Sequence, residues 1–187
     1  MKKIILHLKT IMIHKYWVSY YSFLLRNSFV GIFHDLSKFH PAEFFESIKY
    51  ADGKCSPIIK CKADKGYSIA WLHHKSHNKH HLEYWLDFNG DKIIPIEMPS
   101  IYMKEMLSDW LAAGRTYVGK SFKIKDEYKW MQSRNEILCK MLHGSTNMKI
   151  RKLISILEIL DESGSLIKKI NKIRKEVKKF DKKDNNI

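Results

Sequence analysis

Residues 30–38 read Val-Gly-Ile-Phe-His-Asp-Leu-Ser-Lys, an apolar run that ends on His34 and Asp35. Burying a carboxylate beside such a run costs several kcal/mol unless it is paired or binds a cation. An aspartate can bridge two metal ions through its two oxygens while the histidine before it binds one of them. The alternative role for Asp35 is that of a helix N-cap. The pair predicts a buried site for divalent metal ions.

Helical periodicity dominates the sequence around this pair. Six residues at helical spacing define the inner face of a first long helix: His7, Ile11, His14, Val18, Tyr21 and Leu25. The chain has only 4 prolines and 8 glycines, no internal repeat and no convincing strand alternation, so the predicted fold class is all-α. Gly31 is expected to loosen the chain before His34. Pro41 is expected in the first turn of a short helix, and Ser100 is expected to cap another helix.

The same periodicity predicts further helices over residues 41–50, 63–85, 100–117 and 124–142, and after residue 144. Composition rich in turn residues predicts loops over residues 51–61 and 87–99. We expect two parts: a helical metal-binding domain over residues 1–144, and basic amphipathic C-terminal helices over residues 145–187.

The composition is that of a globular protein with an unusual charge. The chain has 187 residues, of which 44% are hydrophobic, and a formal net charge of +14. This charge favours anionic partners, such as a phosphorylated small molecule or nucleic acid. The three cysteines form no CxxC pair, which argues against a disulfide framework and against a cysteine zinc site. No stretch approaches the ~20 apolar residues of a membrane span. We therefore expect a cytoplasmic protein without a membrane partner.

Further metal ligands are expected where polar residues fall on apolar helical faces. His14 lies in the middle of the first stripe, and Asp109 shares a face with apolar residues of its own helix. Residues 71–81 contain half of the ten histidines, and on one helix His74 and His81 would share the apolar arc. His80 remains the alternative to His81. The competing interpretations are a core histidine at position 14 and a surface cluster in the run.

Lys38 follows Asp35 by three residues and could reach over the metal site if the segment turns helically. There it would hold a fixed positive charge for a phosphoryl oxygen. The competing interpretation is an ordinary surface lysine.

The ordered set of residues resembles a known family. His14, then Phe33-His34-Asp35-Leu36-Ser37-Lys38, then Asp109 is similar to the H…HD…D signature of the HD-domain metal-dependent phosphohydrolases. The spacing His74-x3-Asn78-x-His80-His81 resembles an uncharacterised HD-like family of bacterial and viral proteins. The resemblance covers roughly residues 7–117.

The resemblance implies a fold, a cofactor and a reaction. The fold would be an HD-domain-like helical bundle with a basic C-terminal helical extension. His14, His34, Asp35 and Asp109 would hold one metal ion, and His74 with His81 or His80 would complete a second site. Such ligands suit Mn, Fe, Ni, Co, Zn or Mg. With Asp35 and Lys38 as catalytic residues, metal-activated water would hydrolyse a phosphate ester or anhydride, with a nucleotide-like substrate as the preferred class.

Three other functions stay open on the sequence alone. Some HD-like proteins use a di-iron centre of similar ligands as an oxygenase. The C-terminal lysines suit a basic nucleic-acid-binding protein in which the histidines are structural. A metal-binding scaffold without catalytic activity would share the same ligands.

Overall fold

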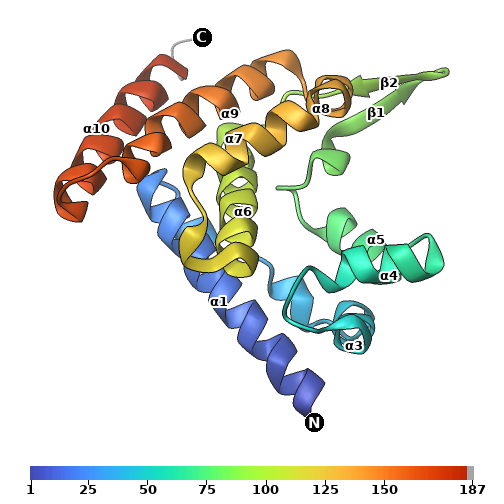
Figure 1. The fold of residues 1–187 in the computed structure, drawn as a ribbon. Helices are drawn as coiled ribbons and strands as arrows, with labels where there is room; N and C mark the ends of the chain where they lie inside the picture. Colours follow the sequence, from blue (N-terminus) through green and yellow to red (C-terminus); the bar gives the residue numbers. More distant parts are fainter. Residues whose placement is uncertain (185–187) are drawn as a thin grey trace.

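The structure is a computed structural model that describes residues 1–184. It is an α-helical bundle with one small β-hairpin, which confirms the predicted fold class (Figure 1). The α-helices are α1 (Lys2–Leu24), α2 (Ser28–Phe33), α3 (Pro41–Tyr50), α4 (Pro57–Lys65), α5 (Ile69–His77), α6 (Ser100–Val118), α7 (Ile124–Ser133), α8 (Asn135–Met141), α9 (Gly144–Leu157) and α10 (Leu166–Asp184). Short 3-10 turns are η1 (Leu36–Phe39), η2 (Leu82–Trp85), η3 (Gly119–Ser121) and η4 (Glu158–Asp161). The hairpin pairs β1 (Leu86–Asn89) with β2 (Lys92–Pro95) in antiparallel register.

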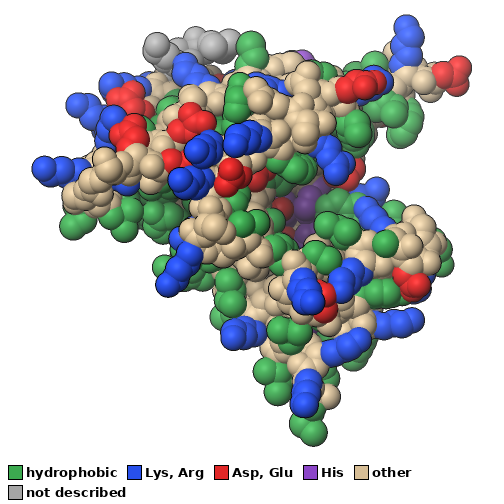
Figure 2. All heavy atoms as spheres, viewed as in Figure 1, with side chains coloured by type: hydrophobic (Ala, Val, Ile, Leu, Met, Phe, Trp, Pro, Cys, Tyr) green, Lys and Arg blue, Asp and Glu red, His purple; other side chains and the backbone are tan. Residues whose placement is uncertain are grey.

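Helices α1 and α6 pack along each other at the centre of the bundle (Figure 1). Helices α3, α4 and α5 form a group beside the N-terminal half of α1 (Figure 1). Helix α10 contacts the C-terminal end of α1, and α7 and α9 pack on α6. The hairpin projects from the body next to α8. The two helical groups lie on either side of a hollow in the surface, which Figure 2 shows.

The hydrophobic core is continuous from the first helix to the last. Val18 of α1, Leu107 of α6 and Leu153 of α9 belong to the same buried cluster as Ile173 and Val177 of α10. Six lysines of α10 are exposed on the other faces of this helix, as expected for an amphipathic helix: Lys168, Lys172, Lys175, Lys178, Lys179 and Lys182. The expected boundary after residue 144 falls in the first turn of α9, and the hydrophobic core extends across it. Within residues 1–184, no helix is both long and apolar enough to cross a membrane.

Several predicted elements are confirmed. The inner stripe of α1 is buried from His7 to Tyr21, and Pro41 begins α3, which ends at Tyr50 as expected. Helix α6 begins at the expected residue, but Ser100 is not its cap. Pro99 stands at the N-cap position, where no side chain caps the helix.

Other predicted elements are wrong because single residues interrupt the helical pattern. The helix expected over residues 63–85 is two helices, since Gly66 ends α4 in a left-handed conformation with a φ of 82°. Helix α4 starts inside the loop expected over residues 51–61. Arg134, with a φ of −109°, divides the helix expected over residues 124–142. Residues 87–99 contain most of the hairpin instead of a loop alone.

Gly31 does not loosen the chain before His34, contrary to the expectation from the flexibility of glycine. It lies inside α2 and is buried where this helix crosses α1. A Cβ atom at position 31 would lie 2.6 Å from the Cβ of Ser22, so only glycine permits this close approach. The Ser19 hydroxyl also donates to the Gly31 carbonyl at 3.2 Å. This contact brings the end of α2, and hence His34 and Asp35, against α1.

Candidate metal centre

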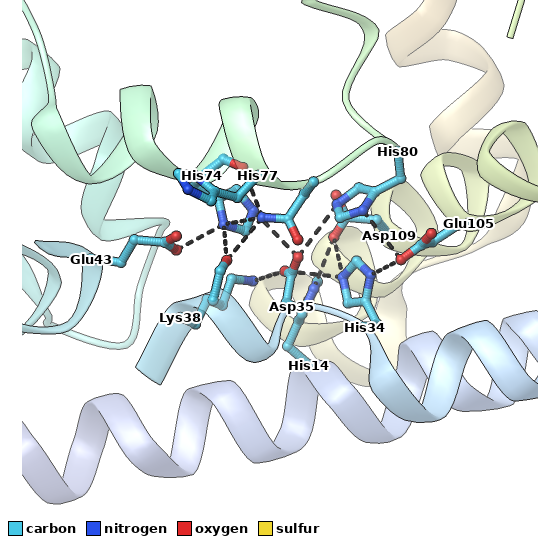
Figure 3. A network of polar contacts seen from close by, with 12 residues as sticks. His14, His34, Asp35, Lys38, Glu43, His74, His77, His80, Glu105 and Asp109 are labelled. Atoms are coloured by element: carbon cyan, nitrogen blue, oxygen red, sulfur yellow. Dashed lines mark hydrogen bonds and ion pairs between the residues drawn. The ribbon is translucent and has the colours of Figure 1, made fainter. Parts of the chain in front are cut away.

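His34 and Asp35 form a tight turn between α2 and η1. Asp35 has a φ of 55°, a left-handed conformation that is uncommon outside glycine and is enriched in aspartate. Asp35 stands at the N-cap position of η1, but its buried side chain makes no capping hydrogen bond to this turn. The turn leaves both carboxylate oxygens facing the interior of the bundle, where the other predicted ligands gather (Figure 3).

The first group of ligands contains His14, His34, Asp35 and Asp109, whose nearest ligand atoms all lie within 4.8 Å of one another. Nε2 of His14 is 2.9 Å from Oδ1 of Asp109. Nε2 of His34 is 3.0 Å from Oδ2 of Asp35 and 3.4 Å from Oδ1 of Asp109. Helices α1 and α6, which pack along each other, thus contribute one ligand each, and the turn after α2 contributes two.

The second group contains Asp35, His74, His80 and His81, again within 4.8 Å. Nε2 of His74 and Nε2 of His80 are each 3.4 Å from Oδ1 of Asp35. Both His80 and His81 are buried, so the structure places both alternatives at the site. Asp35 belongs to both groups, with Oδ2 towards His34 and Oδ1 towards the second group, an arrangement in which one carboxylate can bridge two ions.

His80 and His81 reach the site by a different path from the one expected. Helix α5 ends at His77, and Asn78 is extended, with a φ of −120° and a ψ of 111°. The side-chain amide of Asn78 donates to the His74 carbonyl at 2.7 Å and to the Ser37 hydroxyl at 2.8 Å. These hydrogen bonds fix the direction in which the chain leaves α5. The argument from a shared helical arc is therefore wrong, although it selected two residues that lie at the site.

The buried lone pairs indicate what the site is built to hold. Nε2 of His14, His34, His80 and His81 and both oxygens of Asp35 are buried and make no well-oriented hydrogen bond to the described residues, although Nε2 of His14 lies close to Asp109 and Lys38 forms an ion pair with Oδ2 of Asp35. Leaving a buried polar atom unsatisfied costs about 1–3 kcal/mol. The Lys38 ammonium contacts only one of these six atoms, so burying the other five is costly unless a further cation binds them. Imidazole nitrogen with carboxylate oxygen is a donor set for divalent transition metals, so these residues fit one or two such ions.

Two glutamates that the sequence analysis did not select contact the rings of the candidate ligands. Oε1 of Glu105 lies 3.0 Å from Nδ1 of His34 and 3.2 Å from Nδ1 of His80. Oε2 of Glu43 lies 2.8 Å from Nδ1 of His74. Because a carboxylate only accepts, each Nδ1 carries the hydrogen and each Nε2 faces the centre. In the sequence, the clue that could have identified Glu105 as a site residue is its position one helical turn before Asp109.

Replacing Glu105 with glutamine should weaken metal binding by about 10–100-fold, the usual effect of losing a carboxylate behind a ligating histidine. Glutamine keeps the shape of the side chain but loses the charge that fixes two imidazoles. Competition of the protein with a chromophoric chelator measures the change. Glu97→Gln, at an exposed position remote from the ligands, is the control and should leave the affinity unchanged.

The site is set up electrostatically for metal binding. Although burial opposes ionisation, His34 and Lys38 hold the pKa of Asp35 well below its usual value. Contact with His14 and His34 does the same for the pKa of Asp109, again against burial. Burial and the neighbouring His80 lower the pKa of His81 well below its usual value. Ionised aspartates and a neutral imidazole are the forms that bind metals.

Lys38 lies beside the metal ligands, as predicted. Its ammonium is 2.5 Å from Oδ2 of Asp35. Burial opposes protonation, but the Asp35 and Asp109 carboxylates outweigh it and raise the pKa of Lys38, so the lysine stays charged. It is therefore a fixed positive charge within the site and not an ordinary surface lysine.

A cavity of about 270 Å³ opens onto the site. Figure 2 shows histidine side chains in the hollow between the two helical groups. Lys38, His14, His74, His81 and Asp109 line the cavity. Trp71, Trp110, Tyr117 and Trp130 contribute aromatic faces to its walls, beside aliphatic and polar side chains. A substrate that enters can thus meet an aromatic surface and the ligand groups together.

A second cavity of about 310 Å³ lies against Trp17 and Tyr20 of α1. Arg115 lines it, but its guanidinium already donates to the carbonyls of Gly119 and Phe122. The metal-binding groups found in the described part of the chain all lie elsewhere. This second cavity is therefore not the site that the candidate ligands define.

The remaining histidines of the run form a surface cluster. The rings of His73 and His77 stack with centroids 4.0 Å apart, and His40 stacks on the other side of His73 at 4.3 Å. The competing interpretation of the run as a surface cluster is thus correct for His73 and His77. His74, His80 and His81 point into the site instead.

Comparison with known proteins places this site within a family. No curated protein and no solved structure matches the chain. A family model described as a family of unknown function, DUF5662, matches residues 3–156, which include every ligand of both groups. Since this match covers most of the chain, the protein belongs to the DUF5662 family.

Proposed function

We propose that this protein is a metal-dependent phosphohydrolase of the HD type that cleaves a phosphate ester or anhydride of a nucleotide-like substrate. The observation that carries the proposal is the position of Asp35, which is buried between two groups of ligands and shared by both. Divalent ions held there would supply a Lewis acid and an activated water. The order of ligands along the chain, His14, then His34-Asp35, then Asp109, supports the HD assignment.

Lys38 supports the choice of a phosphorylated substrate. It lines the cavity and keeps its charge beside Asp35. When a phosphoryl group enters, the ammonium can leave Asp35 and donate to an equatorial oxygen, where negative charge accumulates during transfer. The cavity has no other lysine and no arginine among its described lining residues, so Lys38 is the protein's own cation for this purpose.

The aromatic walls support a substrate with a planar ring. Trp110 and Trp130 meet edge to face, with centroids 5.3 Å apart, on one side of the cavity, and Trp71 lies on the side of α5. Such faces stack on nucleobases. If these histidines served only a structural role, their ring nitrogens would have hydrogen-bond partners. The unpartnered ring nitrogens at this site therefore favour the enzyme over the nucleic-acid-binding alternative.

Turnover of aryl phosphate esters and a nucleotide panel by the metal-loaded protein tests the proposal. We expect hydrolysis that a chelator abolishes. His74→Ala should lower kcat/KM by at least about 100-fold, because losing a ligand costs more than losing the partner of a ligand. His77→Ala is the matched control from the surface of the same helix and should retain activity.

Equal losses in the two histidine variants, with both folded by circular dichroism, would refute the assigned site. An inactive panel, together with an oxygen-sensitive visible spectrum of the iron-loaded protein, would replace the hydrolase by the oxygenase alternative. A protein that binds metal but shows neither hydrolysis nor an oxygen-sensitive spectrum would be a metal-binding scaffold without catalytic activity.

A further inference from the structure

The cavity at the metal site extends beyond the candidate ligands towards the N-terminal end of α1. His7 of α1 lines this part, together with Ser47 of α3 and Ser56, the residue before α4. His7 precedes His14 by two helical turns, which is about 10 Å along the axis of α1. The His7 ring packs on Phe44 of α3, with centroids 5.6 Å apart. This part of the cavity therefore lies away from the ligand groups, where α1 meets α3.

Tyr117 of α6 lies at the same end of the cavity. Helices α1 and α6 run antiparallel, because the residues after the end of α1 contact the start of α6 and the two helices meet again at His14 and Asp109. Tyr117 follows Asp109 by about two turns and His7 precedes His14 by about two turns, so both lie on the same side of that contact. We use the name polar pocket for the part of the cavity lined by His7, Ser47, Ser56 and Tyr117.

The polar pocket contains hydrogen-bonding groups that the protein itself does not satisfy. Both ring nitrogens of His7 are buried without a hydrogen-bond partner among residues 1–184. Ser56 stands at the N-cap position of α4, but its hydroxyl makes no capping hydrogen bond. His7 also belongs to neither group of candidate metal ligands. An imidazole with two unsatisfied nitrogens is costly to bury, so a bound molecule is the partner that this ring lacks.

The charge state of these groups indicates which chemical group they bind. Burial and the Lys38 charge lower the pKa of His7, so its imidazole is neutral at neutral pH and offers one donor and one acceptor. Burial raises the pKa of Tyr117, so its hydroxyl stays protonated. Every group of the polar pocket can thus both donate and accept a hydrogen bond while carrying no charge. The pocket therefore suits neutral hydroxyl groups, such as those of a sugar, better than a second phosphate.

We propose that the polar pocket binds the sugar hydroxyls of the substrate and that His7 distinguishes a ribose from a sugar without these hydroxyls. The inference rests on the proposed function, in which the phosphoryl group meets Lys38 and the planar ring meets the tryptophans. It assigns a binding surface to the remaining part of a nucleotide-like molecule. A site built to hydrogen-bond a hydroxyl rejects the analogue that lacks it, because its own polar groups are then left unpaired. The substrate class is thus a ribonucleotide-like phosphate.

Turnover of ribonucleoside 5′-monophosphates and of their 2′,3′-dideoxy counterparts by the metal-loaded protein tests this inference. In the best pair, the ribonucleotide should have a kcat/KM about 10-fold or more above that of the dideoxy form. His7→Phe keeps a ring against Phe44 but removes both nitrogens. It should lower kcat/KM for the ribonucleotide by roughly 3–10-fold, mainly through KM, which is the effect of one hydrogen bond. Turnover of the dideoxy form and of an aryl phosphate should not change. His77→Phe, on the surface of α5, is the matched control.

A binding measurement separates this inference from the proposed function. Non-hydrolysable 5′-phosphonate analogues of the same pairs should quench the tryptophan fluorescence of the metal-loaded protein, since Trp71 and Trp110 line the cavity. The ribose form should bind more tightly than the dideoxy form, and His7→Phe should remove most of this preference. Ser47→Ala, a smaller change in the same pocket, should reduce the preference by roughly 2–3-fold.

The two proposals fail in different ways. A preference for ribose that His7→Phe removes, in a protein that hydrolyses none of the phosphates, would refute the hydrolase but support the polar pocket. Equal binding of both forms in every pair, or no binding of either, would overturn the polar pocket. A preference that both His7→Phe and Ser47→Ala leave intact, with circular dichroism showing folded variants, would also overturn it.

Discussion

Asp35→Asn is expected to lower phosphoester turnover by about 10³-fold or more, even with metal ions in excess, since the ions supply several kcal/mol of transition-state stabilisation. Asparagine has the shape of aspartate but offers a neutral amide in place of a carboxylate shared by two ligand groups. It also removes the ion pair that positions the Lys38 ammonium. Both the metal ligands and the protein's own cation would therefore be disturbed by one substitution.

Turnover of an aryl phosphate across a range of metal concentrations measures this effect. Asp91→Asn at the exposed hairpin tip is the matched control and should behave as the unaltered protein. Activity of Asp35→Asn within a few-fold of the unaltered protein would show that the reaction does not depend on a shared carboxylate.

Glu127→Gln is expected to stabilise the protein at alkaline pH by about 3 kcal/mol, from a pKa shift of roughly 2.5 units at 1.36 kcal/mol per unit. Glu127 of α7 is buried, and burial together with the Asp109 charge raises the pKa of Glu127 to about 7 from 4.5. The folded state thus holds a proton that the unfolded state releases between pH 4.5 and 7. Stability from this group is present below pH 4.5 and is lost as the pH rises through 7.

Denaturant unfolding of the chelator-treated protein between pH 5 and pH 8.5 measures this difference, a range that brackets the shifted pKa of about 7. At pH 5 the two proteins should be nearly equally stable, and the advantage of Glu127→Gln should grow towards pH 8. Glu136→Gln on the exposed side of α8 is the control and should show no such growth. Parallel curves for Glu127→Gln and the unaltered protein would contradict the assigned protonation.

The sequence was sufficient for the features that depend on helical periodicity. The inner stripe of α1 placed His14 correctly because an uninterrupted helix preserves the spacing of its faces. The same argument failed for residues 63–85, because one left-handed glycine and one extended asparagine redirect the chain. His80 and His81 reach the site on the extended segment that follows α5, so helical spacing could not decide between them.

Other features were hidden because they arise from contacts between distant segments. Glu43 meets His74, and Glu105 meets His34, across 31 and 71 residues, and no spacing rule connects such pairs. The hairpin was missed because each strand has four residues, which is too short for alternation to stand out. Gly31 was misread because the need for a missing side chain appears only when α2 meets α1.

The most direct test of the account is elemental analysis of the protein purified without a histidine tag. We expect up to two divalent transition-metal ions per chain, with most of the metal lost in Asp35→Ala and retained in His77→Ala. A protein that binds no metal when offered Mn, Fe, Co, Ni, Zn or Mg would contradict the account. Loss of the metal in His77→Ala, together with its retention in Asp35→Ala, would also contradict the account.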